Sequence, residues 1–177
     1  FIKYLDPVGG NDRGRIYRVA PDGFRQPKLP NFAEASAKEL VALLDHPNGW
    51  HRDTASRLIY QRQDRAAISA LEKLAASGTT AEGRMGALYS LQGLGALEVA
   101  PLLTALDDSA PLVRASALKL SEALVSDSPL LVAKLAAMTS DPDLRVRYQL
   151  AFSLGAATGR DSTAALVKLA ETDGADS

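Results

Sequence analysis

The sequence predicts an all-α protein in which helix pairs stack into an α-α superhelix, preceded by a short extended segment. The first observation is an arginine that recurs at separations of 32, 30 and 33 residues, at Arg52, Arg84, Arg114 and Arg147. The second is that alanines and leucines follow these arginines at helical spacing. The third is a composition with 46% hydrophobic but only 6% aromatic residues. A repeat of about 30 residues made of two helices is typical of a solenoid, whose repeats bury their apolar faces against one another.

Residues 1–35 differ in character from the rest of the chain. Frequent glycines and prolines interrupt any helical period here, so loops and extended structure are expected. Residues 15–19, Arg-Ile-Tyr-Arg-Val, are predicted to form one short strand, and residues 1–5 a second. Since an isolated hairpin is barely stable in water, this segment is expected to pack on the solenoid or to be the edge of a larger sheet. The predicted domains are therefore 1–35 and 36–177.

The first two helix pairs are predicted over residues 36–44 with 50–61, and 65–76 with 82–94. Ser36 and Glu39 have the spacing of a capping box, which satisfies two amide donors at a helix start. Thr79 and Glu82 offer a second capping box before the fourth helix. Gly95 is expected to end that helix, since glycine adopts the left-handed conformation that a helix end requires.

Two further pairs are predicted over residues 97–106 with 111–124, and 129–138 with 142–157. Ser128 is expected to cap the helix that begins at Pro129, because proline is favoured at the first helical position. A ninth helix, residues 162–171, has an apolar stripe but no following partner in this sequence. The sequence is therefore expected to be a segment cut at both ends from a longer array.

The recurring arginine begins each second helix and predicts a structural ladder between repeats. In repeats three and four an aspartate, Asp108 or Asp141, lies six residues before it. Asp45 is one residue off this spacing and repeat two has no acid there, so the ladder is expected to be weak or broken beside Arg84. The pattern resembles HEAT repeats over residues 36–172, in which an Asp and Arg pair holds adjacent loops. A phosphate-binding arginine row is disfavoured because acidic residues alternate with it.

Charge and composition narrow the function classes. The chain has 20 basic and 21 acidic residues, so no long-range field would attract nucleic acid or an anionic membrane, and neither is an expected partner. It has no cysteine, which excludes disulfides, thiolate nucleophiles, thiolate zinc sites and covalent attachment of c-type haem. No apolar run reaches the roughly 20 residues of a membrane-spanning helix. No cofactor is expected.

Neither a catalytic nor a metal-binding residue is predicted. His46 and His51 are the only histidines, and they lack both the i, i+4 spacing and a third ligand, so they are expected to be solvated. Trp50 is expected to pack in the core rather than to stack on a ligand. Gly93-Leu-Gly95 follows a helix and is predicted to be a helix stop rather than a nucleotide loop. Hydrolase chemistry is disfavoured because no serine lies in a Gly-x-Ser-x-Gly motif.

Two segments resemble a particular protein family. They are residues 14–19, Gly-Arg-Ile-Tyr-Arg-Val, and residues 48–58, Asn-Gly-Trp-His-Arg-Asp-Thr-Ala-Ser-Arg-Leu. Both are similar to large membrane-bound dehydrogenase-like proteins of planctomycetes and verrucomicrobia, in which a β-propeller ends in such a strand, continues into HEAT repeats and is commonly followed by a cytochrome c domain. The resemblance implies that residues 1–35 are the remnant of a propeller, and that the parent protein is exported to the periplasm. The propeller body and the Cys-x-x-Cys-His motif are absent, so no catalytic or haem residue carries over.

The predicted function is a non-catalytic scaffold or spacer that contacts another protein or neighbouring domains of its own chain. The contact surface is expected on the second helices, with these candidates: Trp50, Arg57, Gln61, Tyr89, Gln92, Lys119, Glu122 and Gln149. The alternative is an enzyme on a HEAT-like scaffold, such as a DNA glycosylase or a bilin lyase. Trp50, Arg52 and Asp53 together offer the aromatic, basic and acidic side chains that a glycosylase centre needs. The near-zero net charge of the chain nevertheless argues against a DNA-binding groove. The oligomeric state is not predicted.

Overall fold

The computed structural model describes residues 19–25, 29–157 and 159–173. The chain divides into two units, Phe1–Pro30 and Asn31–Ser177. In the described part of the first unit, residues 19–25 contain a turn closed by a hydrogen bond from the Phe24 N–H to the Pro21 carbonyl, 3.1 Å. The strand predicted over residues 1–5, and all of the strand 15–19 except Val19, lie outside the described residues. Val19 itself is not in a strand.

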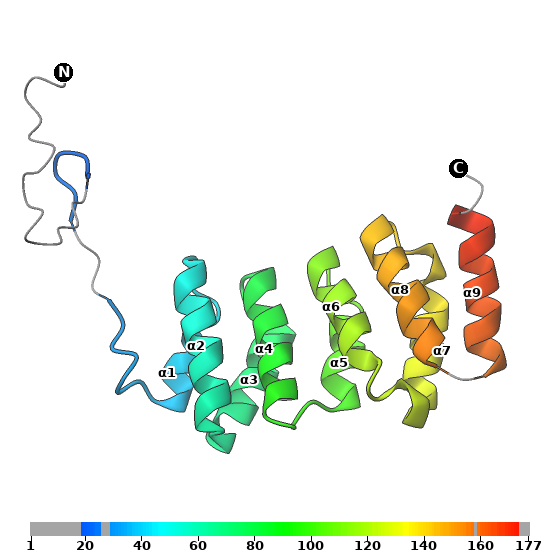
Figure 1. The fold of residues 1–177 in the computed structure, drawn as a ribbon, viewed down its shortest axis with the longest axis horizontal. Helices are drawn as coiled ribbons and strands as arrows, with labels where there is room; N and C mark the ends of the chain where they lie inside the picture. Colours follow the sequence, from blue (N-terminus) through cyan, green and yellow to red (C-terminus); the bar gives the residue numbers. More distant parts are fainter. Residues whose placement is uncertain (1–18, 26–28, 158, 174–177) are drawn as a thin grey trace, which may run out of the picture. The chain divides into compact units, whose positions relative to one another are not determined.

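Four helix pairs and one further α-helix make up the described part of the second unit, which confirms the predicted fold class (Figure 1). The pairs are α1 (Ala37–Leu43) with α2 (Gly49–Arg62), α3 (Ile68–Ser77) with α4 (Ala81–Gly93), α5 (Val99–Ala105) with α6 (Pro111–Ser121), and α7 (Pro129–Ala137) with α8 (Leu144–Ala156). The last helix is α9 (Arg160–Asp173). Short 3-10 turns precede α3, precede α7 and follow α7, at Arg65–Ala67, Val125–Asp127 and Met138–Ser140.

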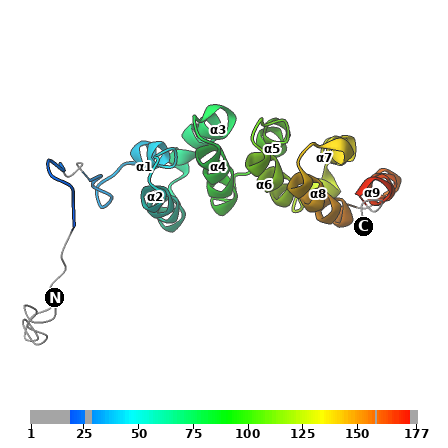
Figure 2. The ribbon, with the colours of Figure 1, turned by 90° about the horizontal axis from the view of Figure 1, so that it is seen from above.

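The helix pairs form two layers. The first helices of the pairs (α1, α3, α5, α7) lie in one layer and the second helices (α2, α4, α6, α8) in the other, as the view from above shows (Figure 2). Each second helix packs against the next second helix, and α9 packs against both α7 and α8. Every pair therefore completes its hydrophobic interior with its neighbours, as a solenoid requires.

The core between the layers consists mainly of leucine. Its largest fully buried side chains are Leu40, Leu44, Leu71, Leu88, Leu91, Leu102, Leu106, Leu118, Leu131, Leu135, Leu150 and Leu154. Burying a leucine stabilises a fold by about 1.5 to 3 kcal/mol, so these residues are the main source of cohesion between the layers. The buried set includes the residues three positions after each repeat arginine: Ala55, Ala87, Ala117 and Leu150.

Three of the four helix ends singled out in the sequence are confirmed. The Ser36 Oγ accepts the Glu39 N–H at 3.3 Å and the Glu39 carboxylate accepts the Ser36 N–H at 2.8 Å, which is the predicted capping box. The Ser128 Oγ accepts the Leu131 N–H at 3.3 Å, with Pro129 at the first helical position. Gly95 has φ +60° and ends α4.

The predicted cap at Thr79 is wrong, because α4 begins one residue later than that cap requires. Thr80 is the N-cap, and its Oγ1 accepts the Gly83 N–H at 3.0 Å. The Thr79 N–H instead donates to Asp45, a residue of the preceding repeat. An acceptor from another repeat has therefore taken the place of the local capping box.

Candidate interaction surface

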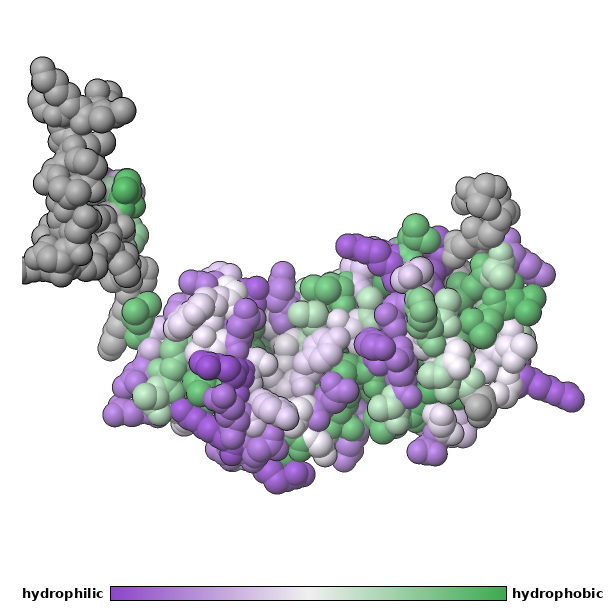
Figure 3. Space-filling model, viewed as in Figure 1, coloured by the Kyte–Doolittle hydropathy of each residue, from purple (hydrophilic) through white to green (hydrophobic). Residues whose placement is uncertain are grey.

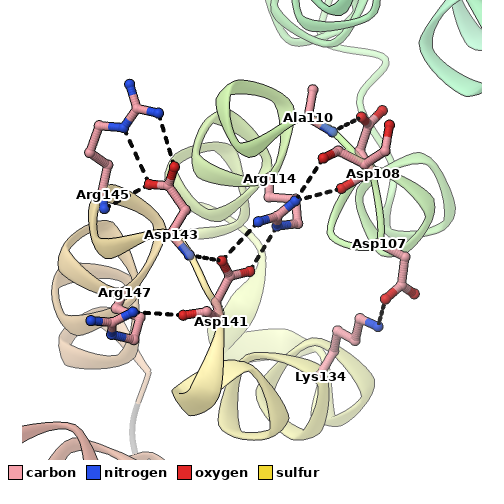
Figure 4. Close-up of polar contacts among 10 residues, drawn as sticks. Asp107, Asp108, Ala110, Arg114, Lys134, Asp141, Asp143, Arg145 and Arg147 are labelled. Atoms are coloured by element: carbon pink, nitrogen blue, oxygen red, sulfur yellow. Dashed lines mark hydrogen bonds and ion pairs between the residues drawn. The ribbon is translucent and has the colours of Figure 1, made fainter. Parts of the chain in front are cut away.

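Two arginine–aspartate pairs join consecutive repeats, and together they are called the arginine ladder below. Arg84 donates from Nε and Nη2 to the two carboxylate oxygens of Asp108, at 2.6 and 2.7 Å. Arg114 donates in the same way to Asp141, at 2.7 and 2.8 Å (Figure 4). Each arginine also holds its own loop, because Nη1 donates to the carbonyl six residues earlier, that of Gly78 or Asp108, at 2.8 Å.

Each ladder aspartate also accepts the backbone N–H of the N-cap residue of the second helix in its own repeat. Asp108 Oδ1 accepts the Ala110 N–H at 2.8 Å, and Asp141 Oδ1 accepts the Asp143 N–H at 2.9 Å. Burial by itself would raise the pKa of both carboxyls. The hydrogen bonds from the paired arginine and from the backbone N–H outweigh burial, so each pKa lies below its ordinary value. The ladder aspartates are therefore ionised at neutral pH.

The predicted position of the break in the ladder is wrong. Arg84, beside which the break was expected, forms a bidentate pair with Asp108. The reason is the direction of pairing: the arginine of one repeat reaches forward to the aspartate of the next. The missing acid in repeat two therefore affects Arg52, which donates to the carbonyls of His46 and Pro47 at 2.9 and 3.0 Å. In the described part of the chain, no carboxylate accepts a hydrogen bond from it.

The position where repeat two lacks an aspartate is Gly78, and the structure gives a steric reason. A Cβ atom there would lie 2.7 Å from the Leu74 carbonyl oxygen and 2.8 Å from Leu74 Cδ1. Such contacts are too close for any side chain, so α3 would have to shift to admit an acid. Because glycine has no Cβ, the chain after α3 can lie close against Leu74 in the last turn of that helix.

Asp45 makes the link between repeats one and two that Arg52 does not make. Its Oδ2 accepts the Thr79 N–H at 2.9 Å, and its Oδ1 accepts the Thr80 N–H at 2.8 Å and the Thr80 hydroxyl. Thr80 has the same place in its repeat as Ala110, whose N–H Asp108 accepts. Burial would raise the pKa of Asp45, but these hydrogen bonds outweigh it and lower the pKa.

At the fourth repeat arginine, Arg147, Nη1 donates to the Asp141 carbonyl at 2.8 Å, as its counterparts do in their loops (Figure 4). Lys134 on α7 forms an ion pair with Asp107, which precedes the ladder aspartate of repeat three. Repeats three and four are thus joined both through Arg114 and through Lys134.

The solvent-facing side of α2, α4, α6 and α8 is called the second-helix face. It follows from the register of the repeat, because the residue five positions after each repeat arginine is exposed. These residues are Arg57, Tyr89, Lys119 and Phe152. The residues eight positions after the arginine, one further turn along each helix, are Tyr60, Gln92, Glu122 and Gly155. Hydrophilic and hydrophobic residues are mixed over this face (Figure 3).

Most of the predicted contact residues are exposed, but two are engaged within the solenoid. Gln149 donates to Glu122 Oε1 at 2.9 Å, and the Ser153 hydroxyl donates to the same oxygen at 3.1 Å, which ties α6 to α8. Lys119 donates to the other carboxylate oxygen of Glu122 at 2.8 Å. Glu122 and Gln149 thus join neighbouring helices.

Three exposed aromatic residues of these helices were not among the predicted contacts. They are Tyr60 on α2, and Tyr148 and Phe152 on α8. The Tyr148 and Phe152 rings lie edge to face with their centroids 5.0 Å apart. Tyr60 and Phe152 lie eight and five positions after their repeat arginines, where Gln92 and Tyr89 are exposed in repeat two, so the register indicates both. It does not indicate Tyr148, because the residue directly after the repeat arginine is half-buried in repeats two and three.

Trp50 and His51 have the opposite burial from the one expected. Trp50 is 62% exposed, although core packing was predicted, and His51 is only 6% exposed, although solvation was predicted. The register explains both findings. The residue directly before the repeat arginine is buried in every repeat: His51, Gly83, Val113 and Val146. The residue before that one is exposed in every repeat: Trp50, Glu82, Leu112 and Arg145.

Residues 31–35 pack over the start of α2. The Phe32 ring stacks on the His51 ring with centroids 5.6 Å apart and meets the Trp50 ring edge to face at 5.4 Å. Arg62, near the other end of α2, donates to the carbonyls of Phe32 at 2.8 Å, Ala33 at 3.1 Å and Ala35. These residues therefore belong to the solenoid, and the boundary between the units falls after Pro30 rather than after residue 35.

Trp50, Arg52 and Asp53 are the residues of the alternative, enzyme-like centre. Arg52 donates to the carbonyls of its own loop, and within the described residues no ion pair joins Arg52 to Asp53. Within the described residues, no group of three or more His, Cys, Asp and Glu side chains could hold a metal ion.

No helix of the described part of the chain has the length and apolar character needed to cross a membrane.

A comparison with known families supports the repeat assignment. The model of the HEAT-repeat family matches residues 37–122, which extend from α1 to just beyond α6. No match is found among curated proteins. The chain therefore contains a HEAT-repeat region, a fold that typically serves as a scaffold for contacts between proteins.

Proposed function

We propose that this HEAT-repeat region is a non-catalytic scaffold that binds a protein through its second-helix face. The observation that carries the proposal is the set of exposed aromatic side chains on that face. They are Tyr60, Tyr89, Tyr148 and Phe152. These side chains are 41 to 67% exposed, so a partner that covers them would remove further apolar surface from water, which favours binding. Aromatic residues are also among the types that dominate binding energy at protein interfaces.

The arginine ladder supports this function because it fixes the spacing of the second helices. Each bidentate pair holds the start of one second helix against the loop of the next repeat, and Glu122 ties α6 to α8 on the face itself. A surface that is ordered before binding loses less conformational entropy when the partner arrives. The helices that carry the aromatic residues are therefore held in fixed positions before a partner binds.

Photocrosslinking from defined positions tests the proposal. A photoreactive amino acid is placed at Tyr89 or Phe152 on the second-helix face, and as controls at Lys73 or Ala100, exposed residues of α3 and α5 in the other layer. We expect positions 89 and 152 to crosslink to the same protein in the source cells, and the control positions to give no such product. Equal crosslinking from the two layers would contradict the assignment of this face.

We further propose that the chain is part of a larger exported, dehydrogenase-like protein, in which the solenoid spaces catalytic and electron-transfer domains. The support is the similarity of residues 14–19 and 48–58 to that family. The reading frame on either side of this segment tests the proposal. We expect an export signal and a β-propeller before it and a cytochrome c domain with Cys-x-x-Cys-His after it. A frame that encodes neither domain would refute this origin and leave the scaffold proposal intact.

A further inference from the structure

A cleft between α5 and α7 lies in the layer of first helices, whereas the second-helix face belongs to the other layer (Figure 2). Its volume is about 560 Å³, within the range of clefts that hold ligands. Apolar side chains make up most of its lining: Leu97, Val99, Leu103, Leu124 and Leu130. Leu130, in the first turn of α7, is 68% exposed, so most of this leucine lies in water. This space is called the apolar cleft below.

A smaller cleft lies on the other side of α5, between α3 and α5, and is called the acidic cleft. Its volume is about 280 Å³, and two glutamates line it, Glu72 of α3 and Glu98 at the start of α5. Glu98 and Ala100 line both clefts. The two clefts therefore adjoin at the beginning of α5, and a single ligand can occupy both.

The two carboxylates of the acidic cleft have no partner of opposite charge. Glu98 is the N-cap residue of α5, but its side chain makes no capping hydrogen bond. Within the described residues, neither Glu72 nor Glu98 forms a side-chain hydrogen bond or an ion pair, and no basic residue lines either cleft. A cation placed beside the two carboxylates would therefore be attracted by both without competition from a lysine or arginine of this chain.

The cleft between the first helices α1 and α3 has a different charge. Its volume is about 290 Å³, and two lysines line it, Lys38 and Lys73. The acid in its lining, Asp45, already accepts hydrogen bonds from Thr79 and Thr80. Unpaired acids beside an apolar cleft are therefore a property of the surroundings of α5 and not of every junction between first helices.

We propose that the two clefts beside α5 bind a segment of another protein in which a lysine or arginine lies close to a large apolar residue. The apolar side chain enters the apolar cleft and removes leucine surface from water. The basic side chain lies beside Glu72 and Glu98, and this charge complementarity selects and orients the segment. Both clefts are open and adjoin across α5, so they fit a peptide that crosses α5 better than a compact small molecule.

Selection of binders from a phage-displayed library of random short peptides, with the whole chain as target, tests the proposal. We expect peptides that share an aliphatic or aromatic residue close to a lysine or arginine. Their affinity should fall about tenfold in Leu130→Ser and in Glu98→Gln, which change exposed residues and should not disturb the fold. The matched controls Leu112→Ser and Glu82→Gln change exposed residues of the same types in the other layer and should leave the affinity unchanged.

The proposal is overturned if no selected peptide loses affinity in both Leu130→Ser and Glu98→Gln, or if the peptides that do so lack a basic residue. Exchanging the charges separates a direct contact from a change in the fold. Glu98→Lys should bind a peptide whose basic residue is replaced by glutamate about tenfold better than the wild-type chain does, and failure of this exchange would also contradict the contact. Because Ala100 lines both clefts, a photocrosslink from it should capture this second ligand and not the protein bound at Tyr89 and Phe152.

Discussion

Replacing Arg114 with alanine is the most direct test of the arginine ladder. The change removes two charged hydrogen bonds to Asp141, at 2.7 and 2.8 Å, and two hydrogen bonds to the carbonyls of Asp108 and Ser109. The Arg114 and Asp141 side chains are 11% and 7% exposed, so the aspartate would remain nearly buried with only one backbone N–H as a partner.

Breaking a fully buried ion pair destabilises a protein by about 3 to 5 kcal/mol, and a surface pair contributes about 0 to 1 kcal/mol. The Arg114–Asp141 pair is nearly buried, so its loss should cost close to the value for a buried pair. Asp141 lies in a loop, however, so some water can reach its carboxylate once the arginine side chain is removed. We therefore expect Arg114→Ala to lower the free energy of unfolding by about 2 to 4 kcal/mol.

Urea denaturation followed by circular dichroism measures this loss. The control is Lys119→Ala on the same helix, since Lys119 is 60% exposed and pairs only with Glu122 of its own repeat. Its loss should stay below about 1 kcal/mol. A double-mutant cycle with Asp141→Asn should show positive coupling, because the two residues form one bidentate contact. Equal losses for the two alanine variants, or zero coupling, would refute the structural role of the ladder.

Three further outcomes follow from the same contacts. The pKa values of the ladder aspartates are lowered in the fold, so these carboxylates stabilise the fold fully above the ordinary pKa of about 3.9. This stabilisation is lost as the pH falls through the lower pKa of the folded state. When unfolding is followed during acid titration, Arg114→Ala should therefore lose less free energy of unfolding than the wild type. Gly83→Ala should destabilise by about 1 to 3 kcal/mol in thermal unfolding, because its Cβ would overlap the Asp45 carboxylate, whereas Gly155→Ala, with open space around it, should be neutral or stabilising. Tyr89→Ala should leave stability nearly unchanged but weaken binding of the crosslinked partner about tenfold, and Lys73→Ala should affect neither.

The elements of the solenoid were predictable because helix formation depends on neighbours along the chain. The capping box at Ser36, proline at position 129 and the glycine stop at position 95 all act within a few residues, and each is found as predicted. The cap at Thr79 failed for the opposite reason, since the acceptor that its N–H uses, Asp45, comes from another repeat.

The exposure of the candidate contact residues was predictable in part. Tyr89, Arg57 and Lys119 are exposed on second helices, as the period of the repeat indicated. Phe152 on α8, which lies edge to face with Tyr148, was not among the candidates, although it lies five positions after its repeat arginine, the place of Arg57, Tyr89 and Lys119.

By itself the sequence determined the helix pairs, the period that stacks them and the residue types available to join them, because periodicity and capping are local properties. Only the tertiary structure shows that Arg84 and Arg114 reach the aspartate of the next repeat and that Asp45 joins repeats one and two. These contacts join groups 24 to 35 residues apart in the chain, whose distances follow from how one helix pair lies on the next.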